Sequence, residues 1–366
     1  MSFKESFFQQ AYELAEQGRG KCGINPFVGA LLVKDNRIIG SGFTQKCGKN
    51  HAEIEAILNA RESTAGAELY VTLEPCCHQG RTPPCTDAII KAGIKKVYAG
   101  IIDPNPLVSG KGFEKLRAAG IEVQDGFWQQ KIEKQLEYYL TYRRKKRPFI
   151  FMKNAVSLDG KIATDAGDSK WISSTESREY SHLLRREAGA IITGIDTVLS
   201  DDPLLNVRLD GKSEPILRII LDSRLRIPLE SKIVTTAQEI PTIVFKSEDH
   251  TDYNTEQMLT LKGVQVKSLP AVNYEYLSLP ALIEELNKLE LPVLMIEAGQ
   301  KLCSSFLRAG LVDKIYYFIS PKILGGKNSV FDELGIDTLA EAINIKIDKV
   351  ETVGDDLLII GYIMKE

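Results

Sequence analysis

One imidazole and two thiols within a short stretch constrain this chain more than any other feature. His51 is followed by Glu53, and further along come Cys76, which follows Pro75, and Cys85. A zinc ion used in catalysis takes three protein ligands and keeps a fourth position for water. His51, Cys76 and Cys85 therefore predict a zinc site with one open position, and Glu53 remains as a free acid beside it.

The elements expected around the three ligands place each of them at the start of a helix. Residues 70–73 predict a strand that runs into Cys76, a helix is expected just after Cys85, and His51 opens a helical run to residue 60. A helix N-terminus favours thiolate over thiol. The alternative is two buried apolar cysteines and a histidine that only satisfies a hydrogen bond. This alternative is less favoured, because His-x-Glu and Pro-Cys occur together in one chain, as they do in zinc enzymes.

His-x-Glu followed by Pro-Cys is the signature of zinc deaminases. In these enzymes zinc lowers the pKa of a water, the activated water attacks a ring carbon that bears an amino group, and the unligated Glu moves the proton. The second cysteine departs from the general signature, because eight residues separate Cys76 from Cys85 where the signature has two.

The residues from His51 to Cys85 closely resemble the deaminase half of the bifunctional riboflavin-biosynthesis deaminase/reductase family. The loop Gly80-Arg81-Thr82-Pro83-Pro84 separates that family from cytidine and transfer-RNA deaminases, and two flanking strings also match. These strings are Asn25-Pro26-Phe27-Val28-Gly29 and Asp103-Pro104-Asn105-Pro106. The resemblance implies that Asn25 contacts the substrate base. Thr44, Glu55 and Cys77 depart from the family, whose members often have His, His and a small residue there.

The segment Gly18-Arg19-Gly20-Lys21-Cys22-Gly23 formally matches the dinucleotide-binding pattern G-x-G-x-x-G. That motif needs a strand before it and a helix after it, so that pyrophosphate meets a helix N-terminus. Here a helix is expected before the segment and a strand after it. We therefore interpret it as a loop at the rim of the zinc pocket.

Composition favours a small-molecule substrate in a reducing compartment. The formal net charge of −3 gives no general attraction to nucleic acid. Of the six cysteines, Cys76 and Cys85 are assigned to metal and Cys77 adjoins Cys76, so no disulfide framework is expected. The N-terminal residues have the amphipathic pattern of a core helix, so we expect no signal peptide, and no apolar run is long enough to span a membrane. We expect a cytoplasmic homo-oligomer that binds neither nucleic acid nor membrane.

The length of 366 residues suggests two domains, and Pro148 marks the expected boundary. The resemblance implies that residues 1–147 are a zinc-dependent pyrimidine deaminase and residues 148–366 an NADPH-dependent reductase. In the first domain, strands are expected at 28–34, 37–42, 68–73, 95–102 and 121–124, and helices at 51–61, 85–92, 110–119 and 129–145. This alternation predicts an α/β sandwich, and the resemblance implies a cytidine-deaminase-like α/β/α sandwich. The basic run at 143–147 is either a solvated helix end that passes into the linker or, less favoured, an anion-binding patch.

The second domain begins with the strand that precedes Ser157-Leu158-Asp159-Gly160. Candidate anion contacts follow: Ser169, and hydroxyl residues at 173–175 that open a helix carrying Arg185. Helix N-termini and arginine side chains hold phosphate. Residue types alone support phosphate binding and ordinary caps with surface charges about equally.

Resemblance favours phosphate binding, because this domain is similar to the reductase half of the same family, which has a dihydrofolate-reductase-like α/β fold. Matching strings are Gly194-Ile195-Asp196-Thr197-Val198, Asp201-Asp202-Pro203, Glu297-Ala298-Gly299 and Pro321-Lys322-Ile323-Leu324-Gly325-Gly326. Carried over position by position, the NADPH contacts fall on Ala155, Trp171, Thr197, Asp201, Ser223, Gly299, Gln300, Lys301, Leu302, Cys303, Ser304 and Ser305. The contacts with the ribosyl phosphate substrate fall on Ser169, Arg185, Leu205, Arg208 and Glu297.

Alternatives stay open at several of these positions. Trp171 and Leu205 could be core residues, and Asp201 could cap a helix or turn. Arg224 and Arg226, beside Ser223, are our candidates for the groups that recognise the 2′-phosphate of NADPH. Two other functional classes are a nucleic-acid deaminase and a structural zinc protein. In a structural zinc protein, Cys77 or His78 would supply a fourth ligand.

The resemblance implies two successive reactions. Zinc-dependent hydrolysis would remove the 2-amino group of 2,5-diamino-6-ribosylamino-4(3H)-pyrimidinone 5′-phosphate. NADPH would then reduce the ribosyl side chain to give 5-amino-6-ribitylamino-2,4(1H,3H)-pyrimidinedione 5′-phosphate. The second step needs positioning of donor and acceptor carbons more than a catalytic group.

Overall fold

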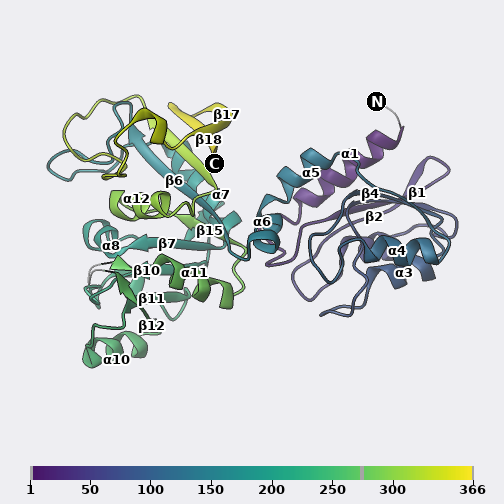
Figure 1. The fold of residues 1–366 in the computed structure, drawn as a ribbon, viewed down its shortest axis with the longest axis horizontal. Coiled ribbons are helices and arrows are strands. Elements are labelled where there is room, and N and C mark those ends of the chain that lie inside the picture. The colour runs from purple at the N-terminus through teal and green to yellow at the C-terminus, as the bar shows by residue number, and fades with distance from the viewer. Residues whose placement is uncertain (1–2, 273–275, 365–366) are drawn as a thin grey trace. The chain divides into compact units, whose positions relative to one another are not determined.

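The computed structural model describes residues 3–272 and 276–364. The chain divides into two compact units, residues 1–147 and 148–366 (Figure 1). Each unit is built around its own sheet. No helix in the described ranges is both long and apolar enough to cross a membrane.

The N-terminal unit is organised around a five-stranded sheet in the order β2-β1-β3-β4-β5. Its strands are β1 (Gly29–Lys34), β2 (Arg37–Phe43), β3 (Glu68–Leu73), β4 (Lys96–Ile101) and β5 (Glu122–Gln124). Its helices are α1 (Phe3–Glu16), α2 (Ala52–Leu58), α3 (Cys85–Lys91), α4 (Lys111–Ala118), α5 (Gln129–Gln135) and α6 (Glu137–Lys145). Strand β1 is antiparallel to β2 and β3, whereas β3, β4 and β5 are parallel.

Helices cover both faces of this sheet. In Figure 1, α1 and α5 lie on one side and α3 and α4 on the other. The approach of α1 to β1 is close, because a Cβ on Gly29 would lie 1.9 Å from the carbonyl oxygen of Ala11. Between the layers, the rings of Tyr70 and Tyr98 stack with centroids 4.7 Å apart. The expected α/β/α sandwich is confirmed.

One expected element differs from the structure. The helix predicted over 129–145 is two helices, α5 and α6, which meet at Leu136. Leu136 is completely buried and leaves helical geometry at φ −96° and ψ 17°. No glycine or proline at that position signals the break. The loop with the G-x-G-x-x-G pattern lies between α1 and β1, which confirms the expected order of helix, loop and strand.

The C-terminal unit contains a nine-stranded sheet in the order β12-β11-β10-β7-β15-β6-β16-β18-β17. Its strands are β6 (Phe149–Ser157), β7 (Ala190–Gly194), β10 (Leu217–Leu221), β11 (Thr242–Ser247), β12 (Gln265–Leu269), β15 (Val293–Ile296), β16 (Lys314–Ser320), β17 (Ile345–Val353) and β18 (Asp356–Ile363). The helices are α7 (Thr175–Ala188), α8 (Ile195–Asp201), α9 (Lys232–Thr235), α10 (Tyr253–Leu261), α11 (Leu279–Lys288) and α12 (Gln300–Arg308), with a 3₁₀ turn η1 (Leu339–Glu341). Two small hairpins pair β8 (Val207–Leu209) with β9 (Lys212–Glu214) and β13 (Ala271–Val272) with β14 (Tyr276–Leu277).

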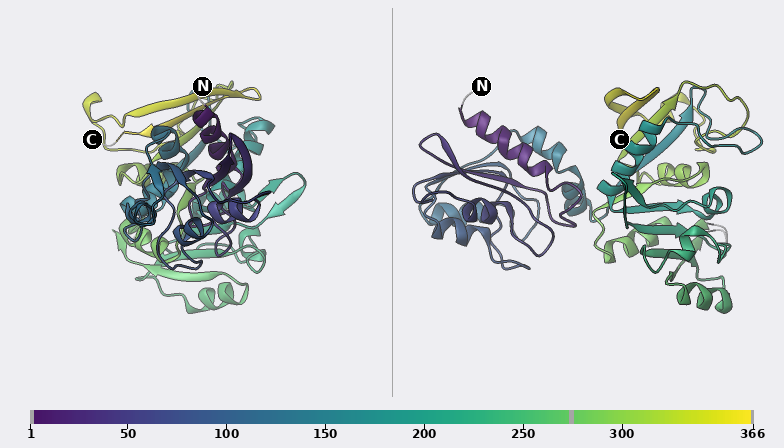
Figure 2. Two further views of the ribbon diagram at one scale, coloured as in Figure 1. Left: turned by 90° about the vertical axis from the view of Figure 1, so that its right-hand side faces the viewer. Right: turned by 180° about the vertical axis from the view of Figure 1, so that it is seen from behind.

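Strands β12 through β16 in this sheet order are parallel, and β18 and β17 add an antiparallel hairpin at one edge. The hairpin is the yellow pair of strands in Figures 1 and 2. The central strands are apolar on both faces, as in β15, where all four residues are buried. In open parallel sheets, ligands bind beyond the carboxyl ends of the strands. Here those ends lead into Ile195 after β7, Asp222 after β10 and Glu297 after β15.

Candidate active sites

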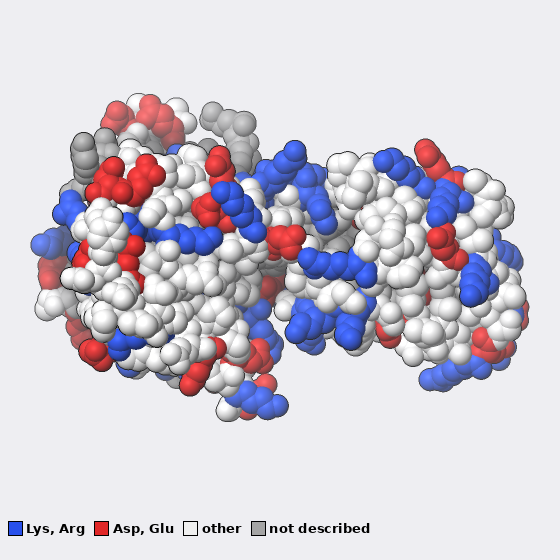
Figure 3. Space-filling view, turned by 90° about the horizontal axis from the view of Figure 1, so that it is seen from below, with Lys and Arg blue, Asp and Glu red and all other residues white. Residues whose placement is uncertain are grey.

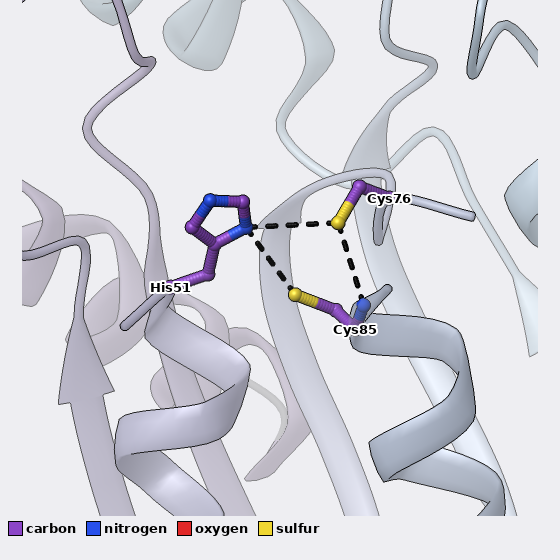
Figure 4. Close-up of side chains that lie close together, drawn as sticks. All are labelled: His51, Cys76 and Cys85. Atoms are coloured by element: carbon purple, nitrogen blue, oxygen red, sulfur yellow. Dashed lines mark hydrogen bonds between the residues drawn. The ribbon is translucent and has the colours of Figure 1, made fainter. Parts of the chain in front are cut away.

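The three predicted metal ligands converge in the N-terminal unit. Nδ1 of His51 lies 3.6 Å from Sγ of Cys76 and 3.3 Å from Sγ of Cys85 (Figure 4). All three ligand atoms lie within 4.8 Å of one another. Zinc binds nitrogen at about 2.1 Å and sulfur at about 2.3 Å, which in a tetrahedral site separates N from S by roughly 3.6 Å. The donor set and its spacing therefore fit zinc, with His51 coordinating through Nδ1.

The prediction that each ligand starts a helix is wrong for Cys76. His51 precedes α2 and Cys85 is the first residue of α3, but Cys76 lies in a loop after β3. The backbone N–H of Cys85 nevertheless donates a hydrogen bond to Sγ of Cys76 at 3.4 Å. Cys76 does not begin a helix itself, but its sulfur accepts a hydrogen bond from the first N–H group of α3.

The two thiols differ in acidity. The hydrogen bond from the Cys85 thiol, followed by that with His51, lowers the pKa of Cys76 to about 4. The same bond and burial raise the pKa of Cys85. The two sulfurs thus hold one proton between them, and a bound cation in the proton's place would allow both to be thiolates.

Glu53 has the properties of a proton carrier. Its side chain is only 4% exposed, and burial raises its pKa to about 7. It also hydrogen-bonds with Cys85, which places it beside the ligands. A carboxyl group whose pKa lies near neutral pH can both accept and release a proton at a small free-energy cost.

Two neighbours fix the ligands in place. Oγ1 of Thr82 lies 3.5 Å from Nε2 of His51, on the side of the ring away from the sulfurs. Glu74 is buried two residues before Cys76, and its carboxylate accepts the backbone N–H groups of Asp103, Gly110, Gly112 and Phe113 at 2.9–3.3 Å. Glu74 thereby ties the loop of Cys76 to the start of α4. Glu74 precedes Pro75 and Cys76 in the sequence, but its role depends on groups distant in sequence.

The departures from the family pattern have partners of their own. Oγ1 of Thr44 accepts the N–H of Val28 at 3.0 Å, and Glu55 accepts the side-chain amide of Asn50 at 2.8 Å. The Cys77 thiol faces the carbonyl of Leu107 at 3.6 Å. Among the described residues, neither Cys77 nor His78 joins the cluster that could hold a metal. Asn25 lies in the loop before β1, and its backbone N–H bonds to the carbonyl of Cys22.

In the C-terminal unit, the starts of α8 and α12 follow the adjacent parallel strands β7 and β15. Gly299 is the N-cap of α12, and a Cβ added there would lie 3.9 Å from Oγ1 of Thr197 in α8. Leu302 faces Gly194, and Lys301 lies 3.9 Å from Asp196. The first turn of α12 has backbone N–H groups that can bind a pyrophosphate, and Gly299 places no side chain there, as a dinucleotide site requires.

Next to the start of α12 lies a partly buried ion pair. Nε and Nη2 of Arg185 each donate to a carboxylate oxygen of Glu297 at 2.8 Å. Lys153, from the middle of β6, lies 3.8 Å from the same carboxylate. Although burial opposes ionisation, Arg185 and Lys153 lower the pKa of Glu297 to about 2. Sequence reasoning identified Arg185 and Glu297 but missed Lys153, for which the signal was a charged residue within an apolar strand.

A second group of polar residues extends from Arg185. Its Nη1 donates to the carbonyl of Asn206 at 3.0 Å, and Arg208 donates to the side-chain oxygen of Asn206. The backbone N–H of Arg208 donates to Nδ1 of His182 at 3.2 Å. Arg185 and Arg208 are thus brought together as expected, and His182 and Asn206 were missed.

The remaining predicted contacts occupy varied positions. Trp171 is 64% exposed and carries the Arg178 guanidinium over its ring at 4.7 Å, so it is not a core residue. Leu205 is buried in an apolar cluster. Asp201 ends α8, and its carbonyl accepts Lys170 Nζ at 3.2 Å, which brings the segment of Ser169 to the end of α8.

The other predicted cofactor contacts lie on β6, after β10 and along α12. Ala155 is on β6, opposite Phe318, and Ser223 follows β10. Along α12, Cys303 and Ser304 are completely buried, whereas Gln300 and Ser305 lie closer to the surface.

Comparison with known proteins identifies both units. Residues 1–101 match the cytidine and deoxycytidylate deaminase zinc-binding region, and residues 148–359 match the RibD C-terminal domain. The riboflavin biosynthesis protein RibD of Aquifex aeolicus is 46% identical, over 97% of each chain.

Solved structures agree. RibD of Acinetobacter baumannii superposes with a TM-score of 0.89 at 36% identity, over 99% of each chain. A diaminohydroxyphosphoribosylaminopyrimidine deaminase/5-amino-6-(5-phosphoribosylamino)uracil reductase of Thermotoga maritima superposes with a TM-score of 0.86 at 37% identity, again over 99% of each chain. The predicted fold classes of both units are confirmed, as are zinc and NADPH as cofactors. The chain belongs to the RibD family of bifunctional riboflavin-biosynthesis enzymes, in which a zinc-dependent deaminase is joined to a reductase.

Proposed function

We propose that residues 1–147 deaminate 2,5-diamino-6-ribosylamino-4(3H)-pyrimidinone 5′-phosphate and that residues 148–366 reduce the product to 5-amino-6-ribitylamino-2,4(1H,3H)-pyrimidinedione 5′-phosphate. The name of the Thermotoga maritima protein states these two activities, and that protein is similar over 99% of this chain. The observation that carries the first half is the convergence of His51, Cys76 and Cys85 beside buried Glu53.

In the deaminase site, His51, Cys76 and Cys85 hold zinc, which supplies an activated water when bound. Glu53 would accept a proton from the attacking water and deliver it to the 2-amino group, which would leave as ammonia while the water oxygen took its place on the ring. Thr82 and Glu74 keep the ligands oriented. Asn25 contacts the pyrimidine ring.

In the reductase site, NADPH supplies a hydride for the anomeric carbon of the opened ribose. The cofactor contacts are Ala155, Trp171, Thr197, Asp201, Ser223 and residues 299–305, with the pyrophosphate at the start of α12. Ser169, Arg185, Leu205, Arg208 and Glu297 hold the substrate. Lys153 joins them, because it faces Glu297 from the neighbouring strand. These residues position the hydride-donating carbon of NADPH against the accepting carbon of the substrate. Hydride transfer between them needs no nucleophilic side chain.

Two competing functions have less support. A structural zinc site would use a fourth protein ligand, and neither Cys77 nor His78 joins the cluster among the described residues. For a nucleic-acid deaminase a basic surface is expected. On the face of the C-terminal unit in Figure 3, acidic and basic side chains are interspersed. A small molecule is therefore the substrate that we propose, without nucleic-acid binding.

We further propose a homo-oligomer in the reducing cytoplasm. All six cysteines are free thiols, as a reducing compartment requires. Edge strand β17 exposes Ile347 and Val350, with Leu357 on the paired strand. An edge strand with exposed apolar residues is a surface that a second copy of the chain could cover.

A coupled assay tests the two-step function. Wild type and Glu53→Ala are each given the diaminopyrimidine phosphate, and NADPH absorbance is followed. We expect wild type to oxidise NADPH and the variant to do so only with the already deaminated compound. If wild type releases ammonia without consuming NADPH, the reductase assignment is wrong.

A further inference from the structure

The reductase site contains a histidine that the carried-over contacts do not include. We propose that His182, through Nε2, binds the 5′-phosphate of the reductase substrate together with Arg208, while Arg185 mainly holds Glu297. This inference rests on the proposed function, because it concerns the ribosyl phosphate compound. Arg208 would then bind the phosphate, and Arg185 would hold the carboxylate of Glu297.

The hydrogen bonds of Arg185 leave it little capacity for a phosphate. Nε and Nη2 form a two-pronged pair with Glu297, and Nη1 donates to the carbonyl of Asn206. A guanidinium presents five donors in a planar fork, and the edge best suited to phosphate is the one that faces Glu297. The charge of Arg185 is likewise balanced by that carboxylate.

Arg208 is arranged differently. It lies on the hairpin strand β8, is exposed, and forms no ion pair with a carboxylate within residues 3–272 and 276–364. Its one side-chain hydrogen bond goes to Asn206, which is buried and anchored by Ser213 Oγ at 2.8 Å. Arg208 is therefore a positioned cation with donors to spare.

The tautomer of His182 follows from its partner. Nδ1 accepts the backbone N–H of Arg208, so in the neutral ring the proton lies on Nε2. Burial, Arg185 and Arg208 lower the pKa of His182 to about 4, which keeps the ring neutral at physiological pH. Nη1 of Arg185 also lies 3.5 Å from Nδ1, and the ring has a further hydrogen bond with the backbone of Asn206; no side chain in the described ranges bonds to Nε2. Nε2–H is thus a donor near Arg208, whose charge no carboxylate in the described ranges pairs with, and this charge favours an anion.

Two substitutions separate ligand binding from a purely structural role. In His182→Asn the amide oxygen can replace Nδ1 as the acceptor for Arg208, but nothing replaces Nε2–H. In His182→Gln the amide nitrogen reaches the position of Nε2, and the acceptor is displaced. His250→Asn is the matched control, because His250 lies outside both sites.

Kinetics with the full chain, zinc and NADPH measure KM and kcat for the deaminated substrate and for its dephosphorylated form. A hydrogen bond to a charged group contributes about 10-fold to 100-fold in affinity. We expect His182→Asn to raise KM for the phosphorylated substrate at least about 10-fold and to weaken inhibition by ribose 5-phosphate equally. The dephosphorylated substrate and kcat should change little, His182→Gln should retain most of the preference for phosphate, and His250→Asn should match wild type.

The opposite pattern overturns the inference. If His182→Asn equals wild type while His182→Gln is impaired, His182 only ties the strand of Arg208 to α7. Equal losses for phosphorylated and dephosphorylated substrates also contradict it. Deaminase turnover of the same samples checks the folding of the N-terminal unit, and thermal unfolding checks the C-terminal unit. A failure of wild type to oxidise NADPH would instead refute the proposed function.

Discussion

The backbone N–H of Cys85 donates to Sγ of Cys76 at 3.4 Å, so the first N–H group of α3 faces a sulfur from another segment. This bond makes one ligand an orienting group for the other. It adds to the hydrogen bonds from the Cys85 thiol and from His51, which are the larger causes of the lowered pKa of Cys76. The loop of Cys76 is held in turn by Glu74, so the metal site depends on contacts from α3 and α4 together.

Replacing Cys85 with Ser should abolish zinc binding, because a serine hydroxyl stays protonated at neutral pH and is a poor zinc ligand. Zinc content of the purified variant, measured by elemental analysis, checks this. Cys77→Ser is the matched control, since Cys77 adjoins Cys76 but faces the carbonyl of Leu107. Loss of zinc from Cys77→Ser would support a four-ligand structural site instead.

Glu53→Gln should keep zinc and lose deamination. The amide preserves the shape of the side chain but cannot accept the proton, so turnover should fall by at least about 10²-fold. Ammonia release measures the rate, and elemental analysis confirms the metal. Glu55→Gln, on the same helix, keeps an oxygen for Asn50 and should remain active. Near-normal turnover of Glu53→Gln would refute the assigned role of Glu53.

Local sequence patterns predicted the elements of the N-terminal unit well, since alternating apolar strands and short helices follow one another as the residues indicate. The errors occur where distant contacts decide the geometry. Residues 129–145 have helical composition throughout, and only burial of Leu136 explains the break. Similarly, four N–H groups from residues 103 to 113 fix the loop of Glu74, and no pattern around Cys76 reveals them.

The C-terminal site was predictable only in part. Resemblance supplied Arg185 and Glu297, but their pairing joins residues 112 positions apart in sequence. His182 and Asn206 are polar residues of ordinary appearance, on a polar helix and in a loop. Their importance depends on hydrogen bonds to Arg208, which require the fold to be known.

The pair Arg185–Glu297 should show strong coupling in stability. Removing one partner of a buried ion pair leaves an uncompensated charge and costs about 3–5 kcal/mol in fully buried cases. The side chains are 12% and 21% exposed, so we expect roughly 2–4 kcal/mol for Arg185→Met. The double variant Arg185→Met/Glu297→Met should recover part of that loss. Denaturant unfolding of the single and double variants measures the coupling, and additive losses would contradict it.

Cofactor preference should depend on Arg226. Its Nη2 lies 2.8 Å from Asp196, in the same part of the unit as Thr197 and Lys301, and both side chains are about half exposed. A surface pair of this kind contributes only about 0–1 kcal/mol, so a phosphate can displace the carboxylate. Arg226→Ala, alone or with Arg224→Ala, should raise KM for NADPH much more than for NADH. Asp196→Asn should have the opposite effect on NADPH, and equal changes for both cofactors would refute this role.

Acid should destabilise the C-terminal unit partly through His182. Its pKa is about 4 in the folded chain, and near 6.5 in the unfolded chain. Between these values the unfolded chain binds the proton and the folded chain does not, so unfolding takes up a proton and falling pH favours it. Stability from this residue is thus intact above pH 6.5 and declines progressively toward pH 4. His182→Asn lacks the ionisable group but keeps the acceptor for Arg208. Its melting temperature should therefore fall less than that of wild type between pH 6.5 and 5, with His250→Asn as control. Parallel pH profiles for wild type and His182→Asn would show that His182 is not held neutral by its surroundings.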